Sequence, residues 1–171
     1  MARIAPLDHA ARADLAALTA QIGAERGRVS PLYATLLHTP GIAAGWLGLL
    51  TAVREQSSLP AFVREIVVLR IAVLHGNVYQ QRSHVSHARA AGVSEEQIEA
   101  LGKMDSPGPL PDELAAIVAY TDAVTRDVEV PDDVFEAVLA SLGERQVLDL
   151  TITIAAYNMV SRVVAALEIG T

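Results

Sequence analysis

Apolar residues recur along this chain at the three- and four-residue spacing of amphipathic helices, with start and stop signals between the segments. The first such segment predicts a helix over residues 7–23. Ser30-Pro31 and Thr39-Pro40 each place a capping residue before a proline at the first helical position. These two signals predict a short helix to about residue 38 and a longer one to about residue 56.

The rest of the chain divides in the same way. Gly92 fits a left-handed helix stop, and Gly143 lies between the last two segments. Ser94 and Gln97 form a capping box, and residues 105–111 form a proline-rich loop. These signals predict helices over residues 60–76, 77–91, a short segment after Ser94, 112–126, 131–142 and 144–168. The β-branched runs IVVLRIAVL and LDLTITIAA resemble strands, but each lies in a long segment without a turn signal. We therefore expect both runs to be buried helices.

The composition indicates which residues form the core between these helices. The 171 residues are 51% apolar but only 4% aromatic, so the core must consist of alanine, valine, leucine and isoleucine. The length favours a single domain over residues 1–171. The fold class expected is all-α, a compact multi-helix bundle. So much apolar surface on a small chain also predicts a homo-oligomer.

Charge and cysteine content exclude several kinds of function. The net charge is −7, with 13 basic against 20 acidic residues, which argues against nucleic acid or an anionic membrane as a partner. The chain has no cysteine, so disulfides, thiolate nucleophiles and cysteine-ligated metals are ruled out. The first residues mix charges with apolar positions, and no uncharged stretch approaches a membrane span. We expect neither a signal peptide nor a span, and a cytoplasmic location.

The most informative candidate site is a glutamate within an apolar run, followed nineteen residues later by a histidine. Glu65 needs a partner, because a carboxylate among apolar residues must be neutralised or bonded to a donor. His84 suits that role, since an imidazole has an ordinary pKa of about 6.5 and can exchange protons near neutral pH. The sequence therefore predicts a Glu65–His84 acid–base pair. A plain helix histidine is the alternative reading.

A polar row surrounds this histidine on the predicted helix. Asn77, Gln80 and His84 fall within one broad face, and His87 lies at its edge. Tyr79 points to the opposite side and joins the site only if the first turn is distorted. The row predicts a packed face with room for water or a small ligand.

Other polar residues have two readings each. Arg70 is surrounded by apolar residues and is either a structural or intersubunit cation or an anchor for a substrate carboxylate. The cluster of Tyr157, Asn158 and Arg162 is either a structural hydrogen-bond group or a second wall of the pocket. A metal site is the remaining alternative, with His84 and His87 as ligands and His75 and Glu65 nearby in sequence.

A set of these motifs resembles the carboxymuconolactone decarboxylase and alkylhydroperoxidase D superfamily, in a cysteine-free branch. The resemblance covers roughly residues 29–169. It rests on Leu37-His38-x-Pro40, Trp46, Arg64-Glu65, Asn77-x-Tyr79, His84-x-x-x-Ala88, Gly92 and Tyr157-Asn158-x-x-x-Arg162.

The resemblance implies an all-helical fold that forms dimers, trimers or hexamers. In the peroxidase branch a Cys-x-x-Cys pair works with a glutamate and a histidine, and here Asn77 and Gln80 occupy the thiol positions. Thiol peroxidase activity is therefore not expected. The decarboxylase branch implies proton transfer by His84, oriented by Glu65, without a cofactor, and Asn77 and Gln80 as neutral hydrogen-bond donors to an enolate oxygen. Tyr79, His87, Tyr157 and Arg162 complete the expected substrate-binding set with Asn77 and Gln80.

The expected function is a cofactor-free lyase or isomerase acting on a small lactone, enol or keto acid. A non-catalytic oligomer that binds a small molecule, or serves as a scaffold, is the first alternative. A metal-dependent oxygenase or hydrolase is the second. The sequence lacks the Tyr-x-Gly-x-Pro segment of the true decarboxylase near its end, so it does not specify the substrate.

Overall fold

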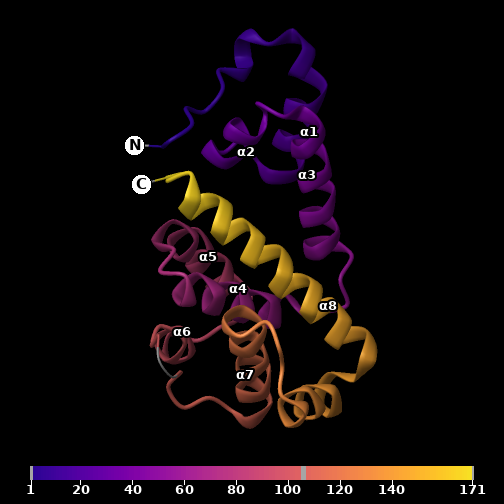
Figure 1. Ribbon diagram of the computed structural model, residues 1–171, viewed down its shortest axis with the longest axis vertical. Helices are drawn as coiled ribbons and strands as arrows, with labels where there is room; N and C mark the ends of the chain where they lie inside the picture. Colours follow the sequence, from indigo (N-terminus) through magenta and orange to yellow (C-terminus); the bar gives the residue numbers. More distant parts are fainter. Residues whose placement is uncertain (1, 105–106, 171) are drawn as a thin grey trace. The chain divides into compact units, whose positions relative to one another are not determined.

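The structure, a computed structural model, describes residues 2–104 and 107–170. All regular elements in these two ranges are helices, which confirms the all-α class (Figure 1). Part of the predicted loop at residues 105–111 lies outside the described residues; residues 107–111 are not helical. The elements are η1 (His9–Ala11), η2 (Ala13–Leu15), α1 (Ala16–Arg26), α2 (Pro31–Leu36), α3 (Pro40–Glu55), α4 (Ala61–Leu74), α5 (Val78–Ala90), α6 (Glu95–Leu101), α7 (Asp112–Arg126) and α8 (Asp132–Ala166).

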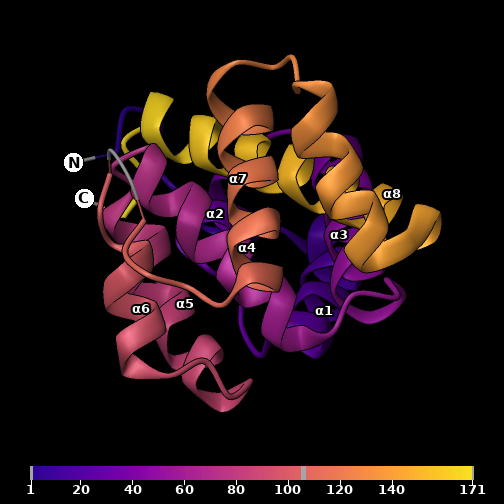
Figure 2. The ribbon, with the colours of Figure 1, turned by 90° about the horizontal axis from the view of Figure 1, so that it is seen from below.

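The chain divides into two compact units. One consists of Met1–Gln56 with Val163–Thr171, and the other is Ser57–Arg162. In the first unit α3 packs against α1 and α2. In the second, α4 contacts α5, α6 and α7, and Figure 2 shows α7 alongside α4. The single domain expected over residues 1–171 stays a prediction, but every candidate site residue lies in the second unit.

The helix expected over residues 7–23 is wrong in its first half. Two short 3-10 turns occupy residues 9–15, and α1 begins only at Ala16. The Leu7 N–H donates to the Ala34 carbonyl at 3.0 Å, which takes the chain out of a helical path. At Arg12 the backbone is not helical (φ −114°, ψ 88°), and its side chain pairs with Asp14. A contact distant in sequence and a non-helical residue therefore override the helical pattern.

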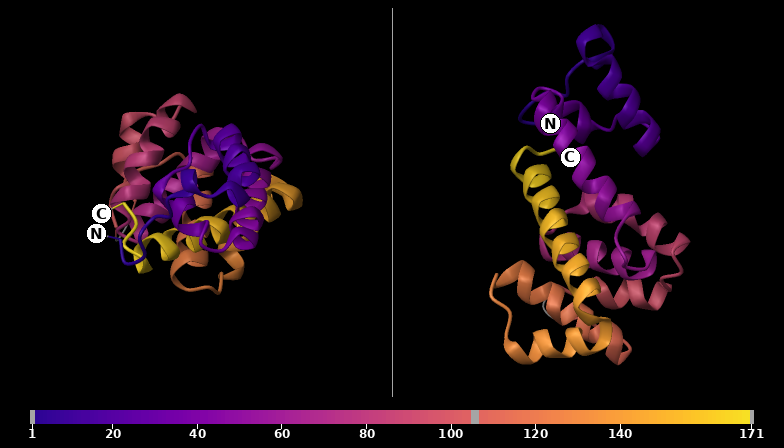
Figure 3. Two further views of the ribbon diagram at one scale, coloured as in Figure 1. Left: turned by 90° about the horizontal axis from the view of Figure 1, so that it is seen from above. Right: turned by 90° about the vertical axis from the view of Figure 1, so that its right-hand side faces the viewer.

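The other start and stop signals place the helices as expected, although Thr39 makes no side-chain capping bond at the start of α3. Ser30 and Ser94 cap α2 and α6 with their hydroxyl oxygens, and Ser94 with Gln97 forms the complete capping box. Gly143 (φ 74°) interrupts α8, so that two helical segments meet at an angle there (Figure 3, right). Positive φ is a conformation that glycine adopts without a steric penalty. The predicted division between residues 142 and 144 is confirmed.

The two β-branched runs are helical, as predicted. The first forms most of α4, where Val63 and every residue from Glu65 to Val73 are buried. A helix buried on all sides is expected when neighbours cover it, and α4 packs against α5, α6 and α7. The second run lies in α8. This helix is long and apolar enough to cross a membrane, but a buried core helix can have the same length and composition. In its most apolar stretch of 18 residues, 56% is buried inside the protein.

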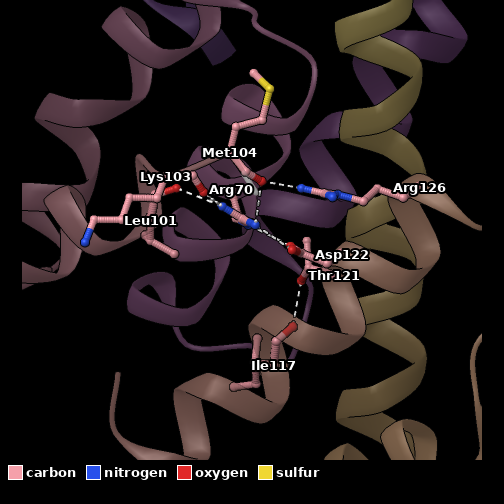
Figure 4. Close-up of polar contacts among 8 residues, drawn as sticks. All are labelled: Arg70, Leu101, Lys103, Met104, Ile117, Thr121, Asp122 and Arg126. Carbon is pink, nitrogen blue, oxygen red and sulfur yellow. Dashed lines mark hydrogen bonds and ion pairs between the residues drawn. The ribbon is translucent and has the colours of Figure 1, made fainter. Parts of the chain in front are cut away.

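Arg70 ties α4 to α7 and to the chain that follows α6 (Figure 4). Its guanidinium is fully buried and forms a two-pronged ion pair with Asp122, with Nε 2.6 Å from Oδ1. The remaining N–H groups donate to the backbone carbonyls of Leu101, Lys103 and Met104, at 3.1, 2.5 and 3.4 Å. These bonds use the five donors that an arginine has. Arg70 is therefore a structural cation and not a substrate anchor.

Candidate functional site

Glu65 and His84 meet in the interior of the second unit. Glu65 comes from the first half of α4 and His84 from the middle of α5, the helix that packs against it. The Nδ1 atom of His84 lies 2.8 Å from Oε2 of Glu65, and the two side chains are only 10% and 3% exposed. A hydrogen bond this short between a carboxylate and a buried ring fixes the orientation of the imidazole. The structure thus brings together the two residues that the sequence pairs.

A nearby arginine adds to the electrostatics of this pair. The Nε atom of Arg64 lies 3.6 Å from Oε1 of Glu65, on the oxygen that His84 does not contact. When Glu65 is ionised its carboxylate only accepts hydrogen bonds, and Nδ1 of His84 then carries the hydrogen. In a neutral ring of this tautomer the lone pair is on Nε2, the nitrogen that can take up a proton from a ligand.

Two amides occupy the first turn of α5. Asn77 caps the helix, with its Oδ1 accepting from the backbone N–H of Gln80 at 3.0 Å. Its Nδ2 donates to Oε1 of Gln80 at 3.3 Å, and both side chains are buried. Ser161 of α8 also donates to Oε1 of Gln80 through its hydroxyl. The structure therefore joins Asn77 and Gln80, as predicted, and adds a serine that the sequence analysis missed.

Tyr157 forms a wall beside the imidazole. Its ring meets that of His84 edge-on, with centroids 5.5 Å apart and an interplanar angle of 86°. The ring of His87 lies 5.7 Å from His84, although His87 itself is exposed. Tyr79 is half-buried and shares no hydrogen bond or ring contact with Glu65 or His84. The predicted site thus gains Tyr157 and His87 as neighbours of His84, and Tyr79 remains outside the bonded group.

Asn158 and Arg162 form a separate polar group on α8. Asn158 donates to Thr125 Oγ1 of α7 at 3.1 Å and to the Ile154 carbonyl at 2.9 Å. Arg162 donates to Oδ1 of Asn158 at 2.9 Å. These bonds support the structural reading of Asn158, because its amide holds α8 against α7. Arg162 is exposed and makes no hydrogen bond to His84.

His75, at the end of α4, reports on the charge of this group. The pKa of His75 is lowered, chiefly because burial desolvates its imidazole and also because Arg162 is positively charged. We expect Arg162→Ala to raise the pKa of His75, measured by NMR titration of the ring protons. The pKa should stay below its ordinary value, since desolvation is the larger cause. Arg89→Ala, at an exposed ion pair with Glu95, serves as the control and should leave it unchanged. An unchanged pKa in Arg162→Ala would contradict the assigned coupling.

The alternative of a metal site at His84 and His87 needs at least one further ligand close to these two histidines. Across residues 2–104 and 107–170, no group of three or more histidine, aspartate or glutamate side chains is placed to hold an ion. His84 uses one ring nitrogen for Glu65, and His87 is its ring neighbour. The residues that meet here are suited to moving a proton, with an imidazole oriented by a carboxylate.

The model of the carboxymuconolactone decarboxylase family matches residues 40–125, just over half of the chain, and the chain belongs to this family. The matched range includes Glu65, Asn77, Gln80 and His84. It ends before the site residues of α8, which are Tyr157, Ser161 and Arg162.

Solved structures show the same fold. A peroxidase-related protein from Ralstonia eutropha with an alkylhydroperoxidase AhpD core superposes with a TM-score of 0.82 at 17% identity, covering 98% of this chain and 90% of that one. An AhpD-like protein of unknown function from Agrobacterium tumefaciens has a TM-score of 0.69 at 24% identity, covering 78% and 92%. A variant of the debrominase Bmp8, in complex with 2,3,4-tribromopyrrole, has a TM-score of 0.79 at 15% identity, covering 97% and 89%.

One curated relative is much longer than this chain. Translation initiation factor IF-2 of Leuconostoc mesenteroides is 29% identical over 136 residues, which are 80% of this chain and 15% of that protein. The chain therefore spans only a small part of this relative.

Proposed function

We propose that this protein is a cofactor-free lyase or isomerase that transfers a proton to or from carbon in a small lactone, enol or keto acid. The observation that carries the proposal is the buried hydrogen bond of 2.8 Å between His84 Nδ1 and Glu65. It holds the ring in one tautomer and leaves Nε2 for a ligand. Proton transfer of this kind needs no thiol, which suits a chain without cysteine.

The chemistry can be written as a balanced step. In decarboxylation, the bond between the α-carbon and the carboxylate breaks, CO₂ leaves, and the electron pair moves onto the neighbouring carbonyl as an enolate. Protonated His84 then gives its Nε2 proton to the carbon, and water reprotonates the ring. In an isomerisation, neutral His84 removes a proton from one carbon and returns it to another. Glu65 stabilises the imidazolium in both cases.

Several features support a small ligand. Tyr157 contacts the imidazole, Gln80 precedes His84 by one turn of α5, and both side chains are buried. Ligand sites combine apolar walls with a few polar groups in this way. The debrominase structure contains a small ring compound, so a fold of this class can hold one. Roles for Tyr79, His87 and Arg162 in substrate binding stay predictions.

A homo-oligomer in the cytoplasm remains part of the proposal. Large apolar side chains are exposed on α3, at Ile42 and Leu49, and on α8, at Leu148 and Ile152. Exposed apolar groups of this kind favour association of subunits.

The proposal is tested by hydrogen exchange at carbon. Small lactone carboxylates, enols and 2-oxo acids are incubated with the protein in D₂O, and deuterium uptake and CO₂ release are followed by NMR. We expect the protein to catalyse deuterium uptake into at least one class of compound. In Glu65→Gln the exchange rate should be lower by at least about tenfold, because the carboxylate orients the imidazole and stabilises its protonated form. Glu95→Gln, an exposed carboxylate paired with Arg89, is the matched control and should exchange normally.

The opposite result would favour the non-catalytic alternative. In that case no compound exchanges faster than in buffer, while calorimetry detects binding that Glu65→Gln does not change. This outcome would overturn the enzyme proposal and leave a binding or scaffold protein.

A further inference from the structure

The carboxamide of Gln80 has one end fully bonded and one end without an acceptor. Gln80 is 3% exposed. Its Oε1 accepts from Ser161 Oγ and from Asn77 Nδ2. Its Nε2 is buried and finds no hydrogen-bond partner within the described part of the chain. Buried donors of this kind are rare in folded proteins, and each calls for an acceptor.

The surrounding bonds decide which end of the amide is which. Asn77 Oδ1 accepts from the backbone N–H of Gln80, so the other end of the Asn77 amide must be the NH₂ group. That NH₂ group donates to Gln80, so the atom facing it must be Oε1. Exchanging the ends of Gln80 would set two NH₂ groups against each other. The helix cap thus determines that the unsatisfied end of Gln80 is a donor.

The position of this donor relates it to the proposed proton carrier. Gln80 and His84 are four residues apart on α5, on one face and about 6 Å apart along the axis. Ser161 and Tyr157 are four residues apart on α8. Gln80 bonds to Ser161, and His84 contacts Tyr157. The two pairs are therefore successive contacts between the same two helices, and the residue with the unpartnered N–H lies one helical turn from His84.

We propose that Gln80 Nε2 donates a hydrogen bond to an oxygen of the bound ligand, a lactone or keto carbonyl that becomes an enolate, while His84 acts on the adjacent carbon. Ser161 is the positioning residue, because it holds Oε1 and so aims the N–H at the ligand. Asn77 contributes to the positioning only, since its amide is used by the helix cap and by Gln80. The inference rests on the proposed function and narrows it to substrates with a carbonyl oxygen beside the reacting carbon.

The test uses tetrahydro-5-oxofuran-2-carboxylate as the probe. This five-membered lactone has the carbonyl, but its carboxylate is not on the carbon beside that carbonyl, so the probe cannot decarboxylate by the proposed step and reports binding alone. We expect the side-chain NH₂ signals of Gln80, assigned by their loss in Gln80→Met, to shift when the probe is added. We expect Gln80→Met to weaken binding about tenfold, the effect of one hydrogen bond. Ser161→Ala, the variant that tests positioning, is compared with Ser83→Ala as its control. Ser83 is an exposed serine on α5, the helix of Gln80, and its hydroxyl donates to the Tyr79 carbonyl. Ser83→Ala should bind the probe normally.

A double-mutant cycle separates positioning from a general structural role. Ser161→Ala should weaken binding in the wild-type background and have no further effect in Gln80→Met, since the serine acts through the amide. Equal weakening in both backgrounds would overturn the positioning role.

The outcomes for the two proposals are distinct. Absence of probe binding, or unchanged affinity and unshifted amide signals, would overturn the donor role of Gln80. The proposed function fails separately, when the panel of substrates shows no exchange that depends on Glu65.

Discussion

Replacing His84 by asparagine is expected to lower the rate of carbon–hydrogen exchange by about 10²- to 10⁴-fold, the usual contribution of a positioned acid or base. Asparagine suits this test because its side-chain N–H can occupy the place of the Nδ1–H and keep the bond to Glu65. It has no counterpart of Nε2. The variant therefore removes the proton carrier and keeps the buried carboxylate bonded. Deuterium uptake in D₂O measures the effect.

A histidine outside the candidate site is the matched control. His38→Asn makes the same substitution at an exposed ring that bonds to the Ala5 carbonyl, in the unit that does not hold the site, and should retain most of the rate. Thermal unfolding of both variants should lie close to that of the wild type. His84→Ala is expected to abolish turnover as well. If Asn158→Ala caused the full loss and the His84 variants caused none, the active site would have to lie elsewhere.

The helix boundaries were predictable where a local signal fixes them. Ser94 with Gln97 and the glycine at 143 act within a few residues of sequence, and the structure shows the cap and the break at those places. The first helix failed because the carbonyl that accepts from Leu7 belongs to Ala34. Periodicity carries no information about such a distant contact.

The candidate site was predictable to a similar extent. A carboxylate in an apolar helix needs a hydrogen-bond donor, and His84 on the next helix was the candidate donor in the sequence. The structure shows this bond. Ser161 was missed because its bond to Gln80 joins residues 81 apart, and their register depends on how α5 and α8 pack. The spacing of Tyr157 and Ser161 on one face was the only available signal. Arg70 kept two readings until its five donors could be counted.

Replacing Arg70 by methionine is expected to lower the free energy of unfolding by about 3–5 kcal/mol, the cost of removing one partner from a buried ion pair. The guanidinium is fully buried, and its loss leaves the carboxylate of Asp122 without its cation. The carbonyls of Leu101, Lys103 and Met104 also lose donors. This amount is a large part of the stability of a small protein. Urea denaturation followed by circular dichroism measures it.

Two further variants separate the buried pair from arginine loss in general. Arg89→Met removes an arginine from an exposed ion pair with Glu95 and should leave the urea midpoint nearly unchanged, because solvent screens such pairs. Arg70→Met combined with Asp122→Leu should recover part of the loss, since no unpaired carboxylate then remains. A single Arg70→Met variant as stable as Arg89→Met would show that the network does not hold α4 to α7. In that case the contact between these helices would depend on apolar packing alone.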